Sequence, residues 1–355
     1  MNNKVLIGMG HPAHFHLFKE LIGELKNKKY ELKIVITDKD ILARLLEEHG
    51  LEYEKLGERK KNEKLIDKAL KIFNSTIVLS RIVRRFCPDI MIGTLSQMAY
   101  VGRLENVPFY FFGEDDINYT FLQCYITYPF VINMVAPVPT NVGIFKYKKI
   151  EYNGYQKLAY LHPNRFKANS ELIPEIDVNS DYSIIRLVDL NAYHDVNING
   201  IDFRFLKILI EKLTKIGRVY ISSENDLPKD FESFRLPINV KHMHHALAYS
   251  TLFVGDSQSM TVEAAILGVP ALKFNDFKGK ISVLNELETK YKLTFGFNTS
   301  QQNEILSKID ELILTQNLKE EFKRRRQKML SEKIDVTSFM LTLVEEKIKQ
   351  KRNKI

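Results

Sequence analysis

Three histidines lie close together near the beginning of the chain, in the segment Gly10-His11-Pro12-Ala13-His14-Phe15-His16. The segment follows the apolar run Val5 to Met9, which predicts a buried strand, and apolar residues then recur at helical spacing. A zinc site needs further ligands at matching spacing, and no Cys or Asp accompanies these histidines, so we expect no metal here. A histidine has a reference pKa of about 6.5, so we expect His11 or His14 to act as a hydrogen-bond donor or general base, with His16 the weaker candidate.

A second stretch with chemical potential is Leu252 to Phe274, which reads as strand, turn, helix, turn and strand. Backbone N–H groups at a helix start are unpaired, and the helix dipole makes that end attractive to anions. Ser257, Gln258 and Ser259 fall at this start, and Glu263 follows about one turn later. A diphosphate on the helix start, with a carboxylate for the ribose hydroxyls, fits this pattern, so we predict a nucleoside-diphosphate site. The alternative is that Ser259 only caps an ordinary helix.

Three carboxylates, Glu114, Asp115 and Asp116, follow the apolar run Phe109 to Phe112. In a parallel sheet the carboxyl ends of the strands meet at the edge where ligands bind. Glu114 or Asp115 therefore qualifies for acid–base chemistry. The alternative is that Asp115 or Asp116 caps the following turn.

An arginine, Arg186, ends the apolar run that begins at Tyr182. A guanidinium at a strand end can clamp a diphosphate through two parallel hydrogen bonds and keeps its charge at every physiological pH. We therefore expect Arg186 to bind the donor phosphates. The alternative is a surface ion pair with Asp189 or Asp195.

Three further histidines lie in the same half of the chain. His194 follows Arg186 in a loop, and His244 and His245 begin a short helix. A histidine N–H can donate to a phosphate or sugar oxygen, so we expect His194 and His244 to contribute to donor binding. Alternatively, one of the two helix histidines packs against Tyr249.

The elements that must position these residues alternate between strands and helices, which predicts an α/β fold with parallel sheets. Residues 1–140 read as a Rossmann-like N-terminal domain, and residues 141–180 as an interdomain connection. Residues 181–335 read as a second Rossmann-like domain, which contains the predicted nucleoside-diphosphate site and in which Ile238 to Val240 is expected to be a strand. The stretch 336–355 reads as a helix that crosses back to the first domain and ends in a basic tail.

The composition limits the partners. The chain of 355 residues has a formal net charge of +8, with basic residues gathered at Lys55–Lys71, Arg81–Arg85, Lys146–Lys149 and Lys347–Lys354. We find no nucleic-acid-binding motif, so the excess charge favours phosphorylated substrates or peripheral contact with an anionic membrane. The alternative is that the charges lie on solvated helix faces.

The same composition predicts a cytoplasmic protein. The N-terminus leads straight into a strand, without the pattern of a signal peptide, and no apolar run approaches the ~20 residues that span a bilayer. The two cysteines, Cys87 and Cys124, show no pairing pattern, as is usual in a reducing compartment. Peripheral attachment to the inner face of the plasma membrane is compatible with this prediction.

The helix-start stretch has the pattern Asp-Ser-x-Ser-x(3)-Glu-Ala-x(3)-Gly-x-Pro over Asp256 to Pro270. It resembles the donor-site segment of the GT-B glycosyltransferases and of the non-hydrolysing UDP-N-acetylglucosamine 2-epimerases. In those families a Ser/Gly turn holds the diphosphate and the Glu, here Glu263, holds the ribose. The chain departs from them in having Gln258-Ser259 where a glycine pair is usual, which leaves less room for a backbone–phosphate contact.

The whole chain is similar to a GT-B-like family known as a domain of unknown function. The similarity rests on the helix-start stretch together with His11 to His16, Gly154 to Pro163, and Arg186 with Ala192 and His194-Asp195. It implies two Rossmann-like doubly wound domains that face each other across a cleft. It also implies, as an expectation, a role in surface-polysaccharide synthesis.

The resulting hypothesis is a metal-independent glycosyltransferase that uses a nucleotide-diphosphate sugar, possibly UDP-linked, as a substrate and needs no cofactor. A sugar or lipid-linked acceptor would meet the first domain near Gly10–His16, Ser96-Gln97 and Glu114-Asp115. One of His11, His14 or Glu114 would take the acceptor proton. The departing diphosphate would be stabilised by the helix dipole and Arg186.

Two rival hypotheses remain. A UDP-sugar 2-epimerase would need acid and base groups on both faces of the sugar, and could recruit Asp115, Glu114 and His194. A non-catalytic protein that binds sugar nucleotides or polysaccharide would need none of these groups.

Overall fold

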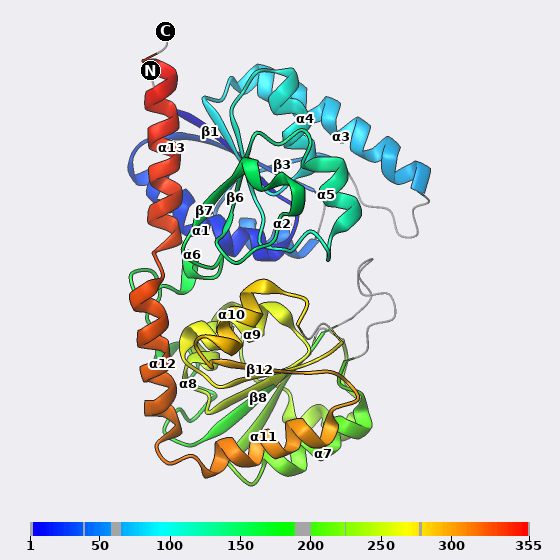
Figure 1. Ribbon diagram of the computed structural model, residues 1–355, viewed down its shortest axis with the longest axis vertical. Helices are drawn as coiled ribbons and strands as arrows, with labels where there is room; N and C mark the ends of the chain where they lie inside the picture. The colour runs from blue at the N-terminus through cyan, green and yellow to red at the C-terminus, as the bar shows by residue number, and fades with distance from the viewer. Residues whose placement is uncertain are drawn as a thin grey trace. The chain divides into compact units, whose positions relative to one another are not determined.

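The computed structural model describes residues 3–37, 40–57, 65–188, 200–223, 225–276 and 279–353. The chain forms two compact units (Figure 1). Unit 1 comprises residues 1–160 and 334–355, and unit 2 comprises residues 161–333. Each unit is an α/β layer structure built on one parallel sheet, which confirms the predicted fold class.

Unit 1 contains, within its described residues, a sheet of seven parallel strands in the order β3-β2-β1-β4-β5-β6-β7. The first six positions of this order are those of a Rossmann fold. The strands are β1 Lys4–Met9, β2 Glu31–Ile36, β3 Glu54–Lys55, β4 Ile90–Gly93, β5 Phe109–Phe112, β6 Asn133–Pro137 and β7 Lys149–Tyr152. Apart from the half-buried Lys4 that begins β1, the residues of the central strands β1, β4 and β5 are hydrophobic or glycine and are buried, because helices cover both faces of the sheet.

The helices of unit 1 connect these strands. They are α1 Pro12–Asn27, α2 Asp40–Glu48, α3 Leu65–Phe86, α4 Ser96–Leu104, α5 Phe121–Thr127, α6 Leu158–Leu161 and α13 Val336–Arg352, with a 3₁₀ helix, η1, at Gly143–Lys148. Helix α1 begins with Pro12 at its first position, where the missing N–H is not needed. Its buried side, with Phe15, Phe18 and Leu21, packs on the sheet.

Two glycines allow β1 and β4 to lie side by side at the centre of unit 1. Gly8 pairs with Gly93, and a Cβ added to Gly93 would lie 2.4 Å from the carbonyl oxygen of Gly8. A Cβ on Gly8 would overlap the sulfur of Met98. No larger residue fits there, because the obstacle at Gly93 is backbone.

Unit 2 contains, within its described residues, a sheet of five parallel strands in the order β9-β8-β10-β11-β12. This is the other common doubly wound order. The strands are β8 Tyr182–Leu187, β9 Arg218–Ser223, β10 Leu252–Gly255, β11 Ala271–Phe274 and β12 Thr294–Phe297. Two helices, α7 and α11, cover one face, while α8, α9 and α10 cover the other (Figure 1).

The helices of unit 2 are α7 Phe203–Leu213, α8 Met243–Tyr249, α9 Gln258–Leu267, α10 Ser282–Thr289, α11 Gln302–Leu314 and α12 Leu318–Glu332, with 3₁₀ helices η2 Ser170–Leu172, η3 Lys229–Phe234 and η4 Val240–His242. Helix α9 is buried along nearly all of its length. It ends at Gly268, whose φ of 83° lies in the left-handed region that favours glycine.

Two segments differ from the sequence expectation. The strand expected at Ile238 to Val240 is absent from the described residues; Asn239 instead accepts a hydrogen bond from Lys241 N and starts η4. Val240 is 80% exposed, so no apolar contact holds it against the sheet. In the stretch expected to be a connection, β7 adds a seventh strand to the sheet of unit 1.

The last helix, α13, packs on unit 1. The Thr337 hydroxyl donates to the carbonyl of Ala159 at 2.8 Å, and Met340, Val344 and Ile348 are buried. Helix α1 lies alongside α13. No helix among the described residues is long and apolar enough to cross a membrane.

Replacing Met340 by Ala should lower the free energy of unfolding by about 2–5 kcal/mol, because it leaves a cavity at a fully buried position. Urea unfolding followed by circular dichroism measures the change. The control is Gln350→Ala, an exposed position on the same helix, which should unfold like the wild type. Equal midpoints for Met340→Ala and the wild type would show that α13 adds nothing to the packing.

Candidate functional site

The first group of predicted site residues lies where β1 and β4 end in unit 1. These neighbouring strands are the point at which the strand order of the sheet reverses, and ligands of doubly wound folds bind outside such a point. His14 bridges the two strand ends. Its Nδ1 lies 3.1 Å from the N–H of Gly10, after β1, and 2.7 Å from the hydroxyl of Thr94, after β4.

The hydrogen bonds of His11 and His14 determine which ring nitrogen carries the proton. A backbone N–H can only donate, so the nitrogen that faces it must have its lone pair available. Nδ1 of His14 faces Gly10 N, and Nδ1 of His11 accepts from Ala13 N at 3.2 Å. In the neutral form of each ring the proton is therefore on Nε2. This geometry favours the hydrogen-bond-donor role over the general-base role for both residues.

His16 differs from the other two histidines. Its ring lies 5.4 Å from the ring of Tyr160 and 5.6 Å from that of Phe15, measured between centroids. The side chain therefore belongs to the packing of α1 against the end of the 154–161 segment.

The carboxylates after β5 have separate environments. Glu114 accepts a hydrogen bond from Gln156 N at 2.7 Å and forms an ion pair with Lys157, and both charged side chains are nearly buried. Asp116 is buried and accepts from Asn141 N at 2.6 Å, as expected of a residue that holds a turn. Asp115 is exposed. Glu114 thus ties the end of β5 to the segment before α6.

The polar pair at the start of α4 also makes structural contacts. Ser96 accepts a hydrogen bond from the Thr127 hydroxyl at 2.7 Å, which joins α4 to the end of α5. The Gln97 amide donates to Ser75 of α3 at 3.1 Å. Both residues remain partly accessible next to Thr94.

The second group of site residues lies at the corresponding reversal point of unit 2, between β8 and β10. Asp256 follows β10, and its Oδ1 accepts from Val188 N, after β8, at 2.9 Å. Its own N–H donates to the carbonyl of Arg186. The Arg186 guanidinium donates to the hydroxyl of Ser222 at the end of β9, at 2.8 Å. Three adjacent strand ends are thereby joined around one arginine and one aspartate.

Asp256 is nearly buried at this point. Burial raises the pKa of Asp256 to about 7, while the N–H groups of Val188 and Ile201 and the charge of Arg186 act in the opposite direction. The carboxyl group therefore takes up or releases its proton near neutral pH. When it is protonated, it no longer offsets the positive charge of Arg186.

Helix α9 begins directly after this aspartate. Ser257 caps the helix by accepting from Met260 N at 3.3 Å, and its own carbonyl accepts from the Thr261 hydroxyl. Ser259, whose alternative role was to cap the helix, is instead exposed in the first turn, next to Gln258. Backbone N–H groups of this turn point out of the helix start, as an anion site requires.

Glu263 lies inside α9 and is only 7% exposed. Its Oε1 is 3.4 Å from Nε2 of His244 at the start of α8, which brings together two residues that the sequence placed in separate motifs. His245 points elsewhere: its Nδ1 accepts from Asn169 N at 3.1 Å and its ring packs on Phe166. His194 lies outside the described residues.

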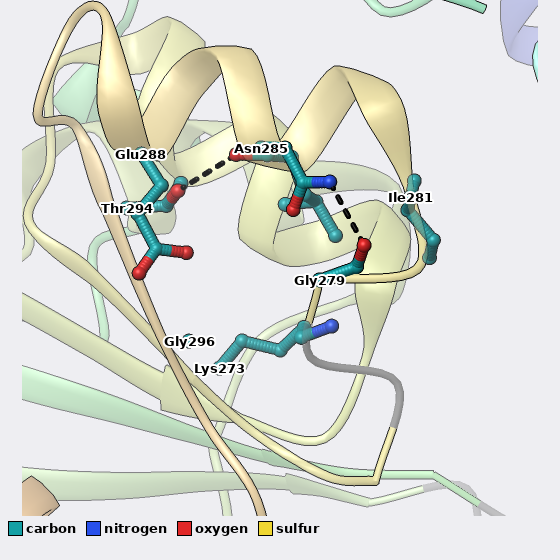
Figure 2. A pocket seen from close by; sticks show the side chains of 8 residues that line it. Lys273, Gly279, Ile281, Asn285, Glu288, Thr294 and Gly296 are labelled. Atoms are coloured by element: carbon teal, nitrogen blue, oxygen red, sulfur yellow. Dashed lines mark hydrogen bonds between the residues drawn. The ribbon is translucent and has the colours of Figure 1, made fainter. Parts of the chain in front are cut away.

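A small pocket opens beside β11, between β12 and the start of α10 (Figure 2). It is lined by Lys273, Gly279, Ile281, Leu284, Asn285, Glu288, Thr294 and Gly296, and Lys273 extends from its strand toward Gly279. Its free volume of about 10 Å³ holds one water molecule and no sugar. Sequence reasoning missed Lys273, since a lysine between the apolar residues of a strand gives no sign of being 97% buried.

The described residues contain no group of three or more His, Cys, Asp or Glu side chains arranged to hold a metal ion. The model of DUF354, a protein family of unknown function, matches residues 3–349, which is nearly the whole chain. The chain belongs to family DUF354. No curated protein matches the DUF354 chain by sequence.

Solved structures similar to the DUF354 chain share its whole fold. UDP-GlcNAc 2-epimerase from Neisseria meningitidis, bound to UDP-GlcNAc, has a TM-score of 0.68 at 16% identity over 97% of this chain and 100% of that one. MurG from Acinetobacter baumannii has a TM-score of 0.64 at 12% identity, over 97% of this chain and 99% of that one. The spinosyn forosaminyltransferase SpnP has a TM-score of 0.66 at 13% identity, over 97% of this chain and 100% of that one. These are GT-B folds, so the GT-B prediction is confirmed.

Replacing Asp256 by Asn should flatten the dependence of stability on pH. The pKa of Asp256 is about 7 in the folded chain and about 3.9 when unfolded, so folding takes up a proton between these values. The stability that this proton contributes is complete below about pH 3.9 and is lost as the pH rises through about 7. In the wild type this group should lower the free energy of unfolding by about 1.4 kcal/mol per pH unit in that window.

Chemical unfolding of Asp256→Asn and the wild type between pH 4 and pH 8 measures the difference. The exposed residue Asp230 in η3 supplies the control, because Asp230→Asn should retain the wild-type pH dependence. Parallel curves for Asp256→Asn and the wild type would mean that the carboxyl group is ionised throughout.

Proposed function

We propose that this DUF354 protein is a GT-B glycosyltransferase that uses a nucleotide-diphosphate sugar and needs no metal ion. The observation that carries the proposal is the convergence of Arg186, Asp256 and the start of α9 at the reversal point of the sheet in unit 2. This is the position where a doubly wound sheet binds an anionic ligand. The similarity in fold to MurG and SpnP supports a transferase.

The donor diphosphate would lie on the helix start, against the N–H groups of the first turn and the side chains of Ser257, Gln258 and Ser259. Arg186 would bind the same phosphates through two parallel hydrogen bonds. Glu263 would accept hydrogen bonds from the ribose, with His244 beside it to orient the carboxylate or to donate to the ligand. His194 is proposed as a further donor from the loop after β8.

Bond cleavage would leave negative charge on the departing nucleoside diphosphate. The positive end of α9 and the guanidinium of Arg186 supply preorganised stabilisation at that position, so no metal ion is required. Protonation of Asp256 near neutral pH strengthens the effect, because a neutral aspartic acid leaves the charge of Arg186 to the phosphates.

The acceptor would bind unit 1 at the ends of β1, β4 and β5. His11 and His14 would donate Nε2–H bonds to acceptor oxygens, since their Nδ1 atoms already accept backbone N–H bonds. The carboxylate that takes the acceptor proton is then Glu114 or Asp115. Asp115 is the exposed one of the two, whereas Glu114 is held by Lys157.

The setting that fits this activity is the assembly of bacterial surface polysaccharide or glycolipid, in the cytoplasm and in peripheral contact with the membrane. A lipid-linked acceptor would account for such contact. The excess of basic residues in the chain is compatible with an anionic surface.

A second candidate is a UDP-sugar 2-epimerase, favoured by the fold similarity to the Neisseria enzyme. That reaction removes and returns a proton on carbon and so needs acid and base groups at the sugar. The Nδ1 atom of His14 accepts a backbone N–H, and we take the donor role that this leaves to Nε2 as support for the transferase. Incubation with UDP-N-acetylglucosamine alone, followed by NMR, separates the two: a new sugar without an acceptor indicates the epimerase.

Glu263→Ala should weaken the binding of UDP by about 10–100-fold, because hydrogen bonds to a charged group contribute about 1.5–3 kcal/mol. Isothermal titration calorimetry measures the two dissociation constants. Glu211→Ala, at an exposed position of α7, is the matched control and should bind like the wild type. An unchanged dissociation constant in Glu263→Ala would remove the ribose assignment.

His14→Gln should retain more activity than His14→Ala, because glutamine keeps an N–H donor near the position of Nε2. Loss of a donor in His14→Ala should lower turnover of the nucleotide sugar by about 10–100-fold. A general base would behave differently, since both variants would then lose about 10²–10⁴-fold. Nitrogen-15 NMR of the wild type should also find the neutral His14 protonated on Nε2, and protonation on Nδ1 would contradict the donor role.

A further inference from the structure

A set of large apolar side chains is exposed on unit 1 between α5 and η1. Their exposed fractions range from 41% for Tyr125 to 79% for Tyr147. We define the aromatic face as Phe121, Tyr125, Ile126, Phe130, Ile132, Ile144 and Tyr147. Single exposed apolar residues are ordinary, but a contiguous group marks a place where the protein meets a partner.

Ring contacts make the aromatic face continuous from α5 to η1. The rings of Phe121 and Tyr125 lie 4.4 Å apart between centroids, and Tyr125 lies 5.8 Å from the buried ring of Phe145. The Lys148 ammonium lies 5.8 Å from the Phe145 ring and 5.6 Å from the Tyr147 ring. Tyr125 of α5 and Tyr147 of η1 are therefore linked through the Phe145 ring and Lys148.

Helix α4 supports the other side of the aromatic face. The ring of Tyr100 lies 5.0 Å from that of Phe130, and its hydroxyl lies within 3.4 Å of the Ile126 carbonyl. The Arg103 guanidinium donates to the carbonyl of Phe130 at 3.3 Å. These contacts hold the turn that carries Phe130 in place, so the exposed Phe130 ring has a defined position.

Positive charge borders this surface. From Ile117 to Ile150 the sequence contains three lysines and no aspartate or glutamate. One of these lysines, Lys149, is nearly buried and pairs with Glu151 at 3.1 Å, so the border charge comes from the other two. Lys146 is exposed beside Tyr147, and Lys148 donates to the carbonyls of Tyr128 and Pro129, each at 2.8 Å. With Arg103 these side chains give the aromatic face a cationic border.

Three basic side chains elsewhere in unit 1 are ion-paired. Arg84 forms an ion pair with Glu105, Arg85 with Glu54, and Lys351 with Asp89. Neutralised charges attract a lipid surface less, so these three side chains are weaker candidates for membrane contact.

We propose that the aromatic face binds the surface of an anionic lipid bilayer. Aromatic rings favour the headgroup level of a membrane, where one end is apolar and the other is wet, and lysines favour anionic lipid phosphates. A second copy of this chain would bring two sets of lysines together, and a polysaccharide would call for hydrogen-bonding side chains where the face has isoleucines. The lipid surface matches both the apolar groups and the charge.

The location of the aromatic face relates it to the acceptor. Helix α5 follows β5 and η1 follows β6, so both segments leave the carboxyl edge of the sheet, the edge that holds His14 and Asp115. The inference rests on the membrane contact in the proposed function and identifies the aromatic face as the part of the protein that makes this contact. It does not depend on catalysis, because it stands on the exposed residues alone.

Sedimentation of the full chain with vesicles tests the inference. We expect binding to vesicles that contain phosphatidylglycerol, weaker binding to pure phosphatidylcholine, and a partial loss at high salt, since salt screens only the charges. The double variant Phe121→Ser with Tyr147→Ser should lower the partition coefficient by about tenfold or more. Lys146→Gln should lower it by about fivefold on anionic vesicles.

The matched control is Phe203→Ser with Leu314→Ser, which removes two equally exposed apolar side chains from unit 2. It should bind vesicles like the wild type. All variants replace exposed groups, so unchanged melting temperatures are expected and are measured alongside. Equal vesicle binding by the wild type and the Phe121/Tyr147 variant would overturn the inference. The inference would also be overturned if light scattering showed a dimer that the Phe121/Tyr147 variant abolishes and if the wild type did not bind vesicles.

Calorimetry with a panel of nucleoside diphosphates keeps this result separate from the proposed function. Vesicle binding that depends on the aromatic face, without binding of any nucleoside diphosphate, would support the membrane surface and contradict the transferase. Nucleoside-diphosphate binding by a chain that does not bind anionic vesicles would support the donor site and contradict the membrane surface.

Discussion

Parallel strands joined by right-handed crossovers leave one point in each sheet where two neighbouring connections depart to opposite faces. No helix covers the strand ends at that point, so backbone groups and polar side chains must satisfy one another there or bind a ligand. Both units of this chain obey the constraint. The reversal lies between β1 and β4 in unit 1, where His14 joins the strand ends, and between β8 and β10 in unit 2, where Arg186 and Asp256 meet.

Different residues join the strand ends at the two reversal points. In unit 1 a histidine ring joins the strand ends by accepting from one backbone N–H and one hydroxyl, which leaves its second nitrogen as a donor. In unit 2 an aspartate accepts the backbone N–H, and burial makes its proton exchange near neutral pH. In the proposed function the first arrangement would bind hydroxyl groups of the acceptor, and the second would bind phosphates of the donor.

Apolar runs and helical spacing were enough to predict the fold class, because strands buried on both faces carry an unmistakable composition. The turn at Ser257 and the helix that carries Glu263 were also predicted from the sequence and are present in the structure. Roles that depend on partners far along the chain were not: Glu114 meets Lys157, and His244 meets Glu263, only after folding. The burial that alters Asp256 is likewise a property of its surroundings, and the strand predicted at Ile238 was wrong because Asn239 caps a helical turn instead.

The return of α13 to unit 1 has a consequence for synthesis on the ribosome. Helix α1 contacts α13, and these elements are separated by nearly the whole chain, whereas unit 2 is formed from one continuous segment. Unit 2 can therefore complete its core while unit 1 still waits for its last helix. Until α13 has been translated, the side of α1 that α13 contacts remains open to chaperones and proteases, so the unit whose synthesis begins first completes its packing last.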